Sequence, residues 1–148
     1  MSNQNVVIRN IARPAVSQLS KLSSFGVATI HEAQGRIGLL APHIRPIYPG
    51  AHAVGSALTV LTHPGDNTML HVAAGECQPG DIVVVALSAD NSDGMLGELL
   101  ATSFRAHGGV GVIIDAGCRD VATLKSMEFR SGQRVFRPKA PQRARLAQ

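Results

Sequence analysis

Two runs of apolar residues constrain the fold of this chain more than any other feature. Residues 81–87 (DIVVVAL) and 110–115 (VGVIID) are strand-sized and rich in β-branched side chains, so we expect both to be buried strands of a sheet. Between them, residues 95–107 space their leucines and Phe104 along one face of a helix, which a Gly-Gly pair ends. Strand, helix and strand in alternation predict a mixed α/β fold.

Shorter elements are predicted around this central unit. The chain of 148 residues has room for one domain, and turns rich in Pro, Gly, Asp and Asn divide it at residues 63–67 and 78–81. We expect a strand over residues 53–62 and helices over residues 14–23, 27–34, 68–75 and about 118–127.

Composition excludes several classes of protein. Hydrophobic residues make up 45% of the chain and charged residues 16%, which is too apolar for a disordered chain. No apolar run reaches the roughly 18 residues of a membrane span, and the polar first five residues lead into no signal sequence. We therefore expect a soluble, cytoplasmic protein with no membrane partner.

The net charge of +4 comes from one end of the chain. Residues 1–129 hold eight Lys and Arg against ten Asp and Glu, whereas residues 130–148 hold six Lys and Arg and no acidic residue. A basic tail of this kind can bind nucleic acid, and such binding would weaken steeply with salt. The rest of the chain is slightly acidic and the sequence is only 3% aromatic, so base-stacking platforms are lacking. We do not expect a nucleic-acid partner.

Several common catalytic and metal-binding motifs are absent from the sequence. It holds no GxSxG, no phosphate-binding P-loop and no dinucleotide fingerprint. His31, His63 and His71 show no HExxH spacing, and Cys77 and Cys118 form no CxxC pair. A zinc site and a disulfide framework are therefore not expected.

The first candidate site is the segment Gly111–Asp120 (GVIIDAGCRD), in which a buried strand leads through a glycine turn into a helix. Open α/β sheets bind ligands at the carboxyl ends of their strands, where this turn would lie. Arg119 offers a planar fork that can bind a carboxylate, and Asp120 offers the hard oxygen that Mg²⁺ prefers. The alternative is that Asp120 caps the last helix and Arg119 is a surface charge.

The second candidate site is the segment 94–100 (GMLGELL), where a loop again leads into a helix. The free backbone N–H groups at the start of that helix can hold an anion such as a substrate carboxylate. Glu98 could hold a proton or a metal-bound water. The alternative is that Glu98 is an acidic residue favoured by the positive end of the helix dipole.

Together, Gly97-Glu98-Leu99-Leu100 and Arg119-Asp120 resemble the spaced signature of the class II pyruvate aldolases. These enzymes act on 4-hydroxy-4-methyl-2-oxoglutarate and 4-carboxy-4-hydroxy-2-oxoadipate, and they share their fold with the regulator of ribonuclease E activity A. The resemblance covers residues 6–129 and favours the aldolase branch. Its further blocks are residues 26–36 (GVATIHEAQGR), 45–48 (RPIY) and 64–67 (PGDN), followed by His71.

The resemblance implies a site, a cofactor and a reaction. The backbone of Gly97, Glu98, Leu99 and Leu100 and the side chain of Arg119 would bind the pyruvyl end of the substrate. Asp120 would be the one direct protein ligand to Mg²⁺ or Mn²⁺, and Glu98 would orient a metal-bound water. The family cleaves its substrates to pyruvate and pyruvate or oxaloacetate, in the degradation of aromatic compounds, and oxaloacetate decarboxylation is the expected side activity.

The same resemblance implies a fold and an assembly. The family's fold is a swivelling β/β/α sandwich, and its members form homotrimers or hexamers. In these assemblies the active site lies between subunits and takes an acidic residue from the C-terminal part of the neighbour. Two alternatives to an active aldolase are an inactive truncated aldolase and a non-catalytic, protein-binding regulator like the ribonuclease E regulator.

The sequence predicts a boundary at residue 129, after which the resemblance ends. Residues 130–148 lack apolar periodicity, hold two prolines and carry six positive charges, so we expect a basic, disordered tail. One hypothesis is that this tail is the family's coding region read in the wrong frame. Codons for residues 130–133 can be chosen so that one added C yields Pro-Val-Trp-Ser, which resembles how family members continue. Sequencing the gene through codon 130 tests this, and an intact frame with different codons would refute it.

Overall fold

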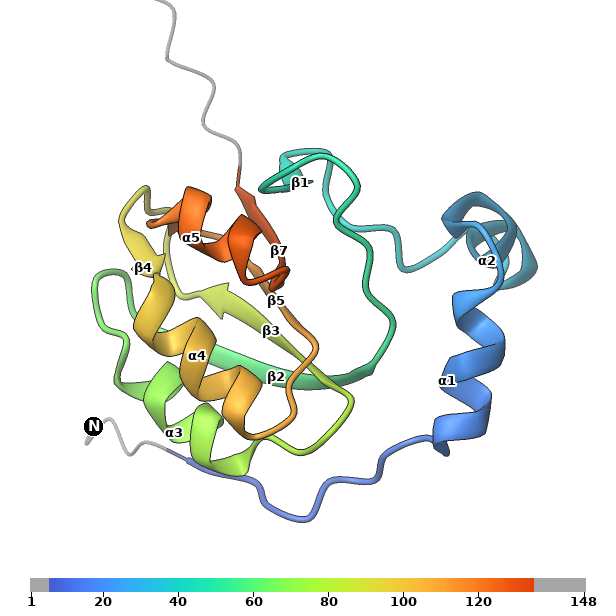
Figure 1. The fold of residues 1–148 in the computed structure, drawn as a ribbon, viewed down its shortest axis with the longest axis horizontal. Helices are drawn as coiled ribbons and strands as arrows, with labels where there is room; N and C mark the ends of the chain where they lie inside the picture. Colours follow the sequence, from blue (N-terminus) through green and yellow to red (C-terminus); the bar gives the residue numbers. More distant parts are fainter. Residues whose placement is uncertain (1–5, 135–148) are drawn as a thin grey trace, which may run out of the picture.

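The computed structural model describes residues 6–134 and confirms the predicted mixed α/β class (Figure 1). Its helices are α1 (Val16–Ser23), α2 (Val27–Ala33), α3 (Thr68–Glu76), α4 (Glu98–Ala106) and α5 (Val121–Ser126). Its strands are β1 (Ile44–Pro46), β2 (Ser56–Thr62), β3 (Asp81–Leu87), β4 (Gly94–Leu96), β5 (Gly111–Ile114), β6 (Gly117–Cys118) and β7 (Arg130–Arg134).

Five of the strands form one sheet in the order β1-β7-β5-β3-β2. The strands β2, β3, β5 and β7 run parallel to one another, and β1 pairs antiparallel with β7. The two apolar runs of the sequence are β3 and β5, which lie side by side inside the sheet. Because the four parallel strands point the same way, their carboxyl ends lie along one edge of the sheet.

The helices α3, α4 and α5 cover one face of this sheet (Figure 1). The core lies between them and the sheet, because β2 turns Leu58 and Val60 inward while α4 turns Leu100 and Phe104 toward the strands. The predicted helix over residues 95–107 begins three residues later than expected. Its first residues instead form β4, which pairs in parallel with β6.

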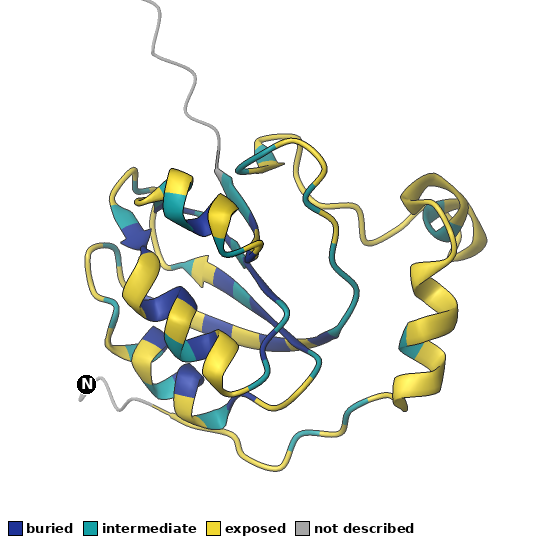
Figure 2. Ribbon diagram, in the orientation of Figure 1, coloured by how far each residue is buried: buried dark blue, intermediate teal, exposed yellow. Residues whose placement is uncertain are grey.

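The first two helices, α1 and α2, are far more exposed than the rest of the helices (Figure 2). In β2 every second side chain is exposed, and Leu61 retains 68% of its surface. Neither α1 nor α2 contains a buried residue, although the apolar spacing of both segments predicted helices correctly. Among the described residues, no helix is long and apolar enough to cross a membrane.

A buried ion pair joins the N-terminal segment to the start of β3. The side chain of Asp81 is fully buried, and Arg13 donates from Nε to Oδ1 and from Nη2 to Oδ2, both at 2.8 Å. The backbone N–H of Gln78 donates to the same Oδ2 at 2.9 Å. The hydrogen bond to Asp81 raises the pKa of Arg13 above its usual value. The sequence placed Asp81 where a turn meets the predicted strand over residues 81–87, and it gave no sign of this pairing.

The sheet continues past the boundary that the sequence predicted at residue 129. The strand β7 (Arg130–Arg134) lies between β5 and β1, so the first five residues of the expected disordered tail are ordered. Strand pairing uses backbone groups and needs no apolar pattern, while small residues at Ser131 and Gly132 allow close neighbours on both sides. The remainder of the expected tail lies outside the described residues.

We predict that Arg13→Met lowers the free energy of unfolding by about 3 kcal/mol, because it leaves the buried carboxylate of Asp81 without its counter-charge. Urea unfolding followed by circular dichroism measures this change. The matched control is Arg9→Met, which removes the exposed ion pair between Arg9 and Glu76 and should cost less than about 1 kcal/mol. Equal losses in the two variants would contradict a special role for the buried pair.

Candidate functional site

The structure brings the two candidate segments of the sequence together. Because β4 pairs with β6, the loop entering α4 lies beside the loop entering α5. The backbone N–H of Arg119 donates to the carbonyl of Leu96 at 2.7 Å, and the N–H of Glu98 donates to Oδ2 of Asp120 at 3.1 Å. The predicted residues Gly97, Glu98, Arg119 and Asp120 therefore form one cluster at the N-terminus of α4.

Gly97 forms the floor of this cluster. A Cβ atom at this position would lie 2.8 Å from Oδ2 of Asp120 and 3.6 Å from Nε and Nη2 of Arg119. The backbone of Gly97 is extended, with φ of −142°, which any residue can adopt. Glycine is therefore required here for close approach and not for an unusual backbone conformation.

Gly94 makes the same kind of room for the stem of Arg119. A Cβ atom at Gly94 would overlap Cγ of Arg119 and would lie 3.0 Å from its Cδ. The sequence singled out the segment that begins at this glycine but gave Gly94 itself no role. Only the pairing of β4 with β6 shows which side chain crosses it.

Asp120 is the N-cap residue of α5 and has an unusual backbone conformation. Its φ of 54° and ψ of 35° lie in the left-handed region, and α5 has no side-chain cap. The alternative interpretation is therefore right about the position of Asp120, whose carbonyl accepts from the N–H of Leu124 at 2.9 Å, but its side chain makes no capping hydrogen bond. The carboxylate instead accepts the hydrogen bond from Glu98 at the start of the neighbouring helix. Left-handed backbone at a non-glycine residue costs of order 1–3 kcal/mol and occurs preferentially at functional sites.

Leu99 and Leu100 follow Glu98 in the first turn of α4, next to the cluster. The side chain of Leu99 is 86% exposed, and that of Leu100 is buried in the core. Both residues lie in the first turn of α4, where N–H groups have no carbonyl partner within the helix. The helix dipole adds positive potential at the same place, so a carboxylate is the natural ligand of this opening.

The donor set of the cluster suits a hard divalent cation. Within residues 6–134 no group of three or more His, Cys, Asp and Glu side chains is arranged to hold a metal ion. Mg²⁺, however, commonly uses one or two carboxylates and retains several waters. Asp120 is exposed, and only its Oδ2 accepts a described hydrogen bond, so its second oxygen and the nearby Glu98 fit such a site.

A turn at residues 91–93, just before β4, is hydrogen-bonded to β6. Asp93 and Asn91 exchange hydrogen bonds, with Nδ2 of Asn91 donating to Oδ2 at 2.8 Å and the N–H of Asp93 donating to Oδ1 at 2.6 Å. The carbonyl of Asp93 accepts from the N–H of Gly117 at 3.0 Å, which fixes β6. The Asn-Ser-Asp spacing was a readable signal for this turn.

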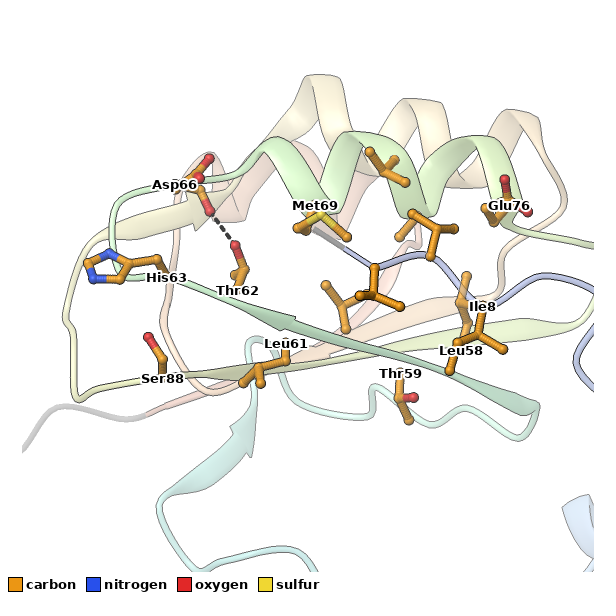
Figure 3. Close-up of a pocket in the computed structure, with 15 residues that line it drawn as sticks. Ile8, Leu58, Thr59, Leu61, Thr62, His63, Asp66, Met69, Glu76 and Ser88 are labelled. Atoms are coloured by element: carbon orange, nitrogen blue, oxygen red, sulfur yellow. Dashed lines mark hydrogen bonds between the residues drawn. The ribbon is translucent and has the colours of Figure 1, made fainter. Parts of the chain in front are cut away.

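The histidines of the sequence lie outside the cluster. His31 is in α2 and His71 in α3, and His63 lines a separate cavity of about 490 Å³ beside β2 (Figure 3). Asp66, in the same turn as His63, accepts from the N–H of Thr68 at 2.8 Å. That hydrogen bond lowers the pKa of Asp66 below its usual value. Asp66 is therefore the turn residue that the sequence predicted.

The cysteines show no sign of reactivity. Both are free thiols within the described residues, Cys77 buried and Cys118 partly buried. Burial raises the pKa of Cys77 above its ordinary value and that of Cys118 to about 12. These raised pKa values keep both thiols protonated at neutral pH, and a protonated thiol is a poor nucleophile.

Comparison with known proteins supports the resemblance seen in the sequence. The family model described as RraA-like, Aldolase/RraA, matches residues 27–147, which continues past Phe129, where the resemblance was expected to end. A curated protein of Halalkalibacterium halodurans, named putative 4-hydroxy-4-methyl-2-oxoglutarate aldolase, is 24% identical over 119 residues. That alignment covers 80% of this chain and 57% of the relative.

Solved structures share the fold. Streptomyces coelicolor RraAS2, titled an unusual member of the RNase ES inhibitor RraA protein family, is 26% identical with a TM-score of 0.68, over 84% of this chain and 65% of that one. The RNA-processing inhibitor RraA from Thermus thermophilis is 17% identical with a TM-score of 0.65, and the match covers 74% of this chain and 66% of that one. The chain thus spans less than two thirds of the curated relative and of the first of these structures.

We predict that Gly94→Ala displaces the side chain of Arg119, because the added methyl overlaps its stem. The Nε–H resonance of Arg119 in a ¹H–¹⁵N spectrum should shift, and overpacking should cost about 1–3 kcal/mol of stability. The control is Gly75→Ala in α3, where the new Cβ meets nothing within 4 Å. An unchanged Arg119 resonance in Gly94→Ala would contradict the predicted contact.

Proposed function

The chain belongs to the RraA-like, Aldolase/RraA family, and from that membership we propose that the cluster at Gly97, Glu98, Arg119 and Asp120 is the active site of a divalent-metal-dependent aldolase. Membership alone does not choose the activity, because the matched relatives carry the names of aldolases and of RNA-processing inhibitors. The choice rests on the chemistry of the cluster.

The observation that carries the proposal is the position of Asp120. The backbone of Asp120 is in a left-handed conformation, and its carboxylate lies near the guanidinium of Arg119. Gly94 and Gly97 leave room for these two side chains. A surface that only binds a protein partner has no need for a carboxylate and an Arg fork at a helix N-terminus. A metal-dependent lyase acting on an anionic substrate needs both.

The proposed substrate is a 4-hydroxy-2-oxo acid, either 4-hydroxy-4-methyl-2-oxoglutarate or 4-carboxy-4-hydroxy-2-oxoadipate. Its pyruvyl carboxylate would lie on the N–H groups of Leu99 and Leu100, as helix N-termini favour anions. Arg119, whose Nε and Nη2 lie close above Gly97, would hold the same end of the substrate. The flexible remainder of the substrate would extend away from α4.

In the proposed reaction the bond between C3 and C4 breaks. The proton of the C4 hydroxyl leaves, the C4 oxygen becomes a carbonyl, and the bonding electrons move to C3 to form the enolate of pyruvate. Glu98, exposed on the first turn of α4, would help to remove that proton, and Arg119 would stabilise the developing negative charge. The enolate is then protonated at C3 to give pyruvate.

We propose Mg²⁺ or Mn²⁺ as the cofactor, held by Asp120. When bound there, such an ion supplies Lewis-acid stabilisation of the enolate oxygen. Oxaloacetate yields the same enolate when it loses CO₂, which is why decarboxylation of oxaloacetate is part of the proposal. The carbonyl product of the two aldol substrates is pyruvate in one case and oxaloacetate in the other.

The oligomeric state and the cellular location of the protein are also proposals. We infer a homotrimer or a hexamer in the cytoplasm, with a neighbouring subunit completing the site. The described cluster supports this because Glu98, Arg119 and Asp120 are all exposed. An active site that excludes water needs a cover, and the described chain provides none over these side chains.

A second candidate function is a non-catalytic regulator of RNA processing. It is favoured by the match to Streptomyces coelicolor RraAS2, whose title names the RNase ES inhibitor RraA family. Such a protein would keep the fold and bind a partner without turning over a 2-oxo acid. The experiment below separates the two functions.

We predict that the purified chain releases pyruvate from oxaloacetate with Mg²⁺ and that EDTA abolishes the release. Asp120→Asn should reduce kcat/KM at least about 100-fold, because it removes the charge that binds the cation. Coupling to lactate dehydrogenase measures pyruvate directly. Each rate is compared with the spontaneous decarboxylation in the same buffer.

The control for this experiment is Glu32→Gln, which removes an exposed carboxylate of α2 that pairs with Arg36. It should leave the rate unchanged. A folded chain without metal-dependent release would contradict the proposed activity and favour the regulator. Full activity in Asp120→Asn would show that the metal is not held at the proposed residue.

A further inference from the structure

The N-terminal segment Val6–Ile8 has the composition of a strand but no strand partner. All three residues are β-branched, and β-branched side chains favour the extended backbone of a sheet. The segment has no regular secondary structure, and within residues 6–134 its backbone forms no hydrogen bond. The local preference for a strand is therefore present, and only a neighbouring strand is missing.

The strand β2 offers such a neighbour, because one of its edges is unpaired. It is the last strand in the order β1-β7-β5-β3-β2, and among the described residues it pairs only with β3. The N–H of Ser56 donates to the carbonyl of Gly80, which directly precedes β3. Backbone groups alternate sides along a strand, so the N–H and C=O groups of Thr59 and Leu61 point to the open edge.

The segment and the open edge face each other across one cavity. The strand β2 forms one wall of the cavity of about 490 Å³, and α3 and Val6–Ile8 form the opposite wall (Figure 3). Ile8 lies at the end of the cavity near Leu58 and Glu76, and the chain before it comes from the end near Thr62. Because β2 runs from Leu58 toward Thr62, the segment runs antiparallel to it.

Two ion pairs hold this segment of the chain close to β2. Nε of Arg9 donates to Oε1 of Glu76 in α3 at 2.8 Å, and Arg13 forms the buried pair with Asp81 at the start of β3. Between them Asn10 has a left-handed backbone, with φ of 54°, so the chain turns directly after Arg9. A tethered segment meets β2 at a high effective concentration, which favours it over any other chain as the occupant of the edge.

The exposure of the three side chains already alternates as it does in a strand. Val6 and Ile8 are exposed by 71% and 76%, whereas Val7 between them is exposed by 41%. The side chains of a strand point alternately to two faces, so Val7 belongs to one face and its two neighbours to the other. In β2 the same alternation buries Val60 on the face that α3 covers and exposes Leu61 on the other.

We propose that Val6–Ile8 closes onto the open edge of β2 as an antiparallel sixth strand of the sheet. In the proposed register Val6 faces Leu61 and Ile8 faces Thr59. Each of these two pairs exchanges both of its N–H···O=C hydrogen bonds, which satisfies the open groups of Thr59 and Leu61. The three residues span about 10 Å when extended, which matches the length of β2 from Thr59 to Leu61 with one residue to spare.

Closure of the segment fills the cavity and protects the edge. In the proposed register Val7 lies opposite Val60, on the face where the half-buried side chains of Met69 and Val72 line the cavity. Contact with these side chains removes apolar surface from water, which favours the closed state. An uncharged edge without Pro can pair with another chain, so the closed segment also prevents association through β2. This conformational device is independent of the proposed aldolase activity.

Amide hydrogen exchange of the full chain, followed by NMR, tests the pairing. The amides of Thr59 and Leu61 should exchange at least about tenfold more slowly than unstructured amides, because the segment accepts their hydrogen bonds. A nuclear Overhauser contact between the Hα atoms of Val7 and Val60 is expected as well. In antiparallel sheets, facing residues that share no hydrogen bonds approach each other most closely.

Two proline variants separate strand pairing from simple contact. Ile8→Pro removes the N–H that donates to Thr59, so the protection of Thr59 and Leu61 should fall at least about tenfold. The matched control is Val7→Pro, whose missing N–H points away from β2, and protection should fall less than about threefold. The amides of Val83 and Val112, in the middle of the sheet, should not change in either variant, which shows that the fold is intact.

Four results would overturn the proposal. The first is wild-type exchange of Thr59 and Leu61 at the rate of unstructured amides, without the Hα contact. The second is protection that survives Ile8→Pro, because something other than the segment would then cover the edge. The third is an equal loss in Ile8→Pro and Val7→Pro, which would mean that the segment touches β2 without pairing. The fourth is protection that disappears on dilution, which would assign the edge to a second copy.

Discussion

The parallel direction of four strands is the constraint on which the rest of this structure depends. Parallel neighbours cannot be joined by tight hairpins, so each return requires a crossover, here supplied by α3, α4 and α5. These crossovers cover one face of the sheet and bring every strand-to-helix junction to the same edge. The cluster at Gly97 and Asp120 forms because β4 and β6, which follow β3 and β5 along the chain, pair with each other in a separate two-stranded sheet.

The same constraint leaves surface that the described chain does not cover. Parallel sheets are normally buried on both faces, yet β2 exposes alternate side chains and α1 and α2 bury no residue. A helix whose apolar side chains have no partner gains little from tertiary packing. Further surface contacts, from other copies or from the additional length seen in relatives, are the physical complement of this one-sided sheet.

The candidate site combines firmly held side chains with a strained backbone conformation at Asp120. Asp120 holds a left-handed conformation because the hydrogen bond from Glu98 and the packing of α5 fix it. The side chain of Leu124 is fully buried and holds α5 against the core. Gly94 and Gly97 are needed since side chains cross their backbone closely, although neither requires glycine for its φ. The conformational free energy that these positions cost is offset by the packing of α4 and α5 against the sheet.

Much of the fold could be predicted from the sequence because local patterns encode it. The apolar runs of β3 and β5, the amphipathic pattern of α4 and the turn at Asp66 each reflect interactions within a few residues. The short strands β4 and β6 could not be predicted, because two or three residues carry no periodicity. The strand β7 was missed because its pairing rests on backbone groups, which a polar sequence provides equally well.

By itself the sequence determined the α/β class, the two segments that carry the candidate chemistry and the family resemblance. Only the tertiary structure decided that the side chain of Asp120 accepts from Glu98 and not from its own helix, that Gly94 makes room for Arg119, and that Arg13 neutralises Asp81. The physical reason is distance along the chain. Patterns of a few residues record local conformation, whereas these contacts join residues 22 to 68 positions apart, or two paired strands, and form only when the sheet is complete.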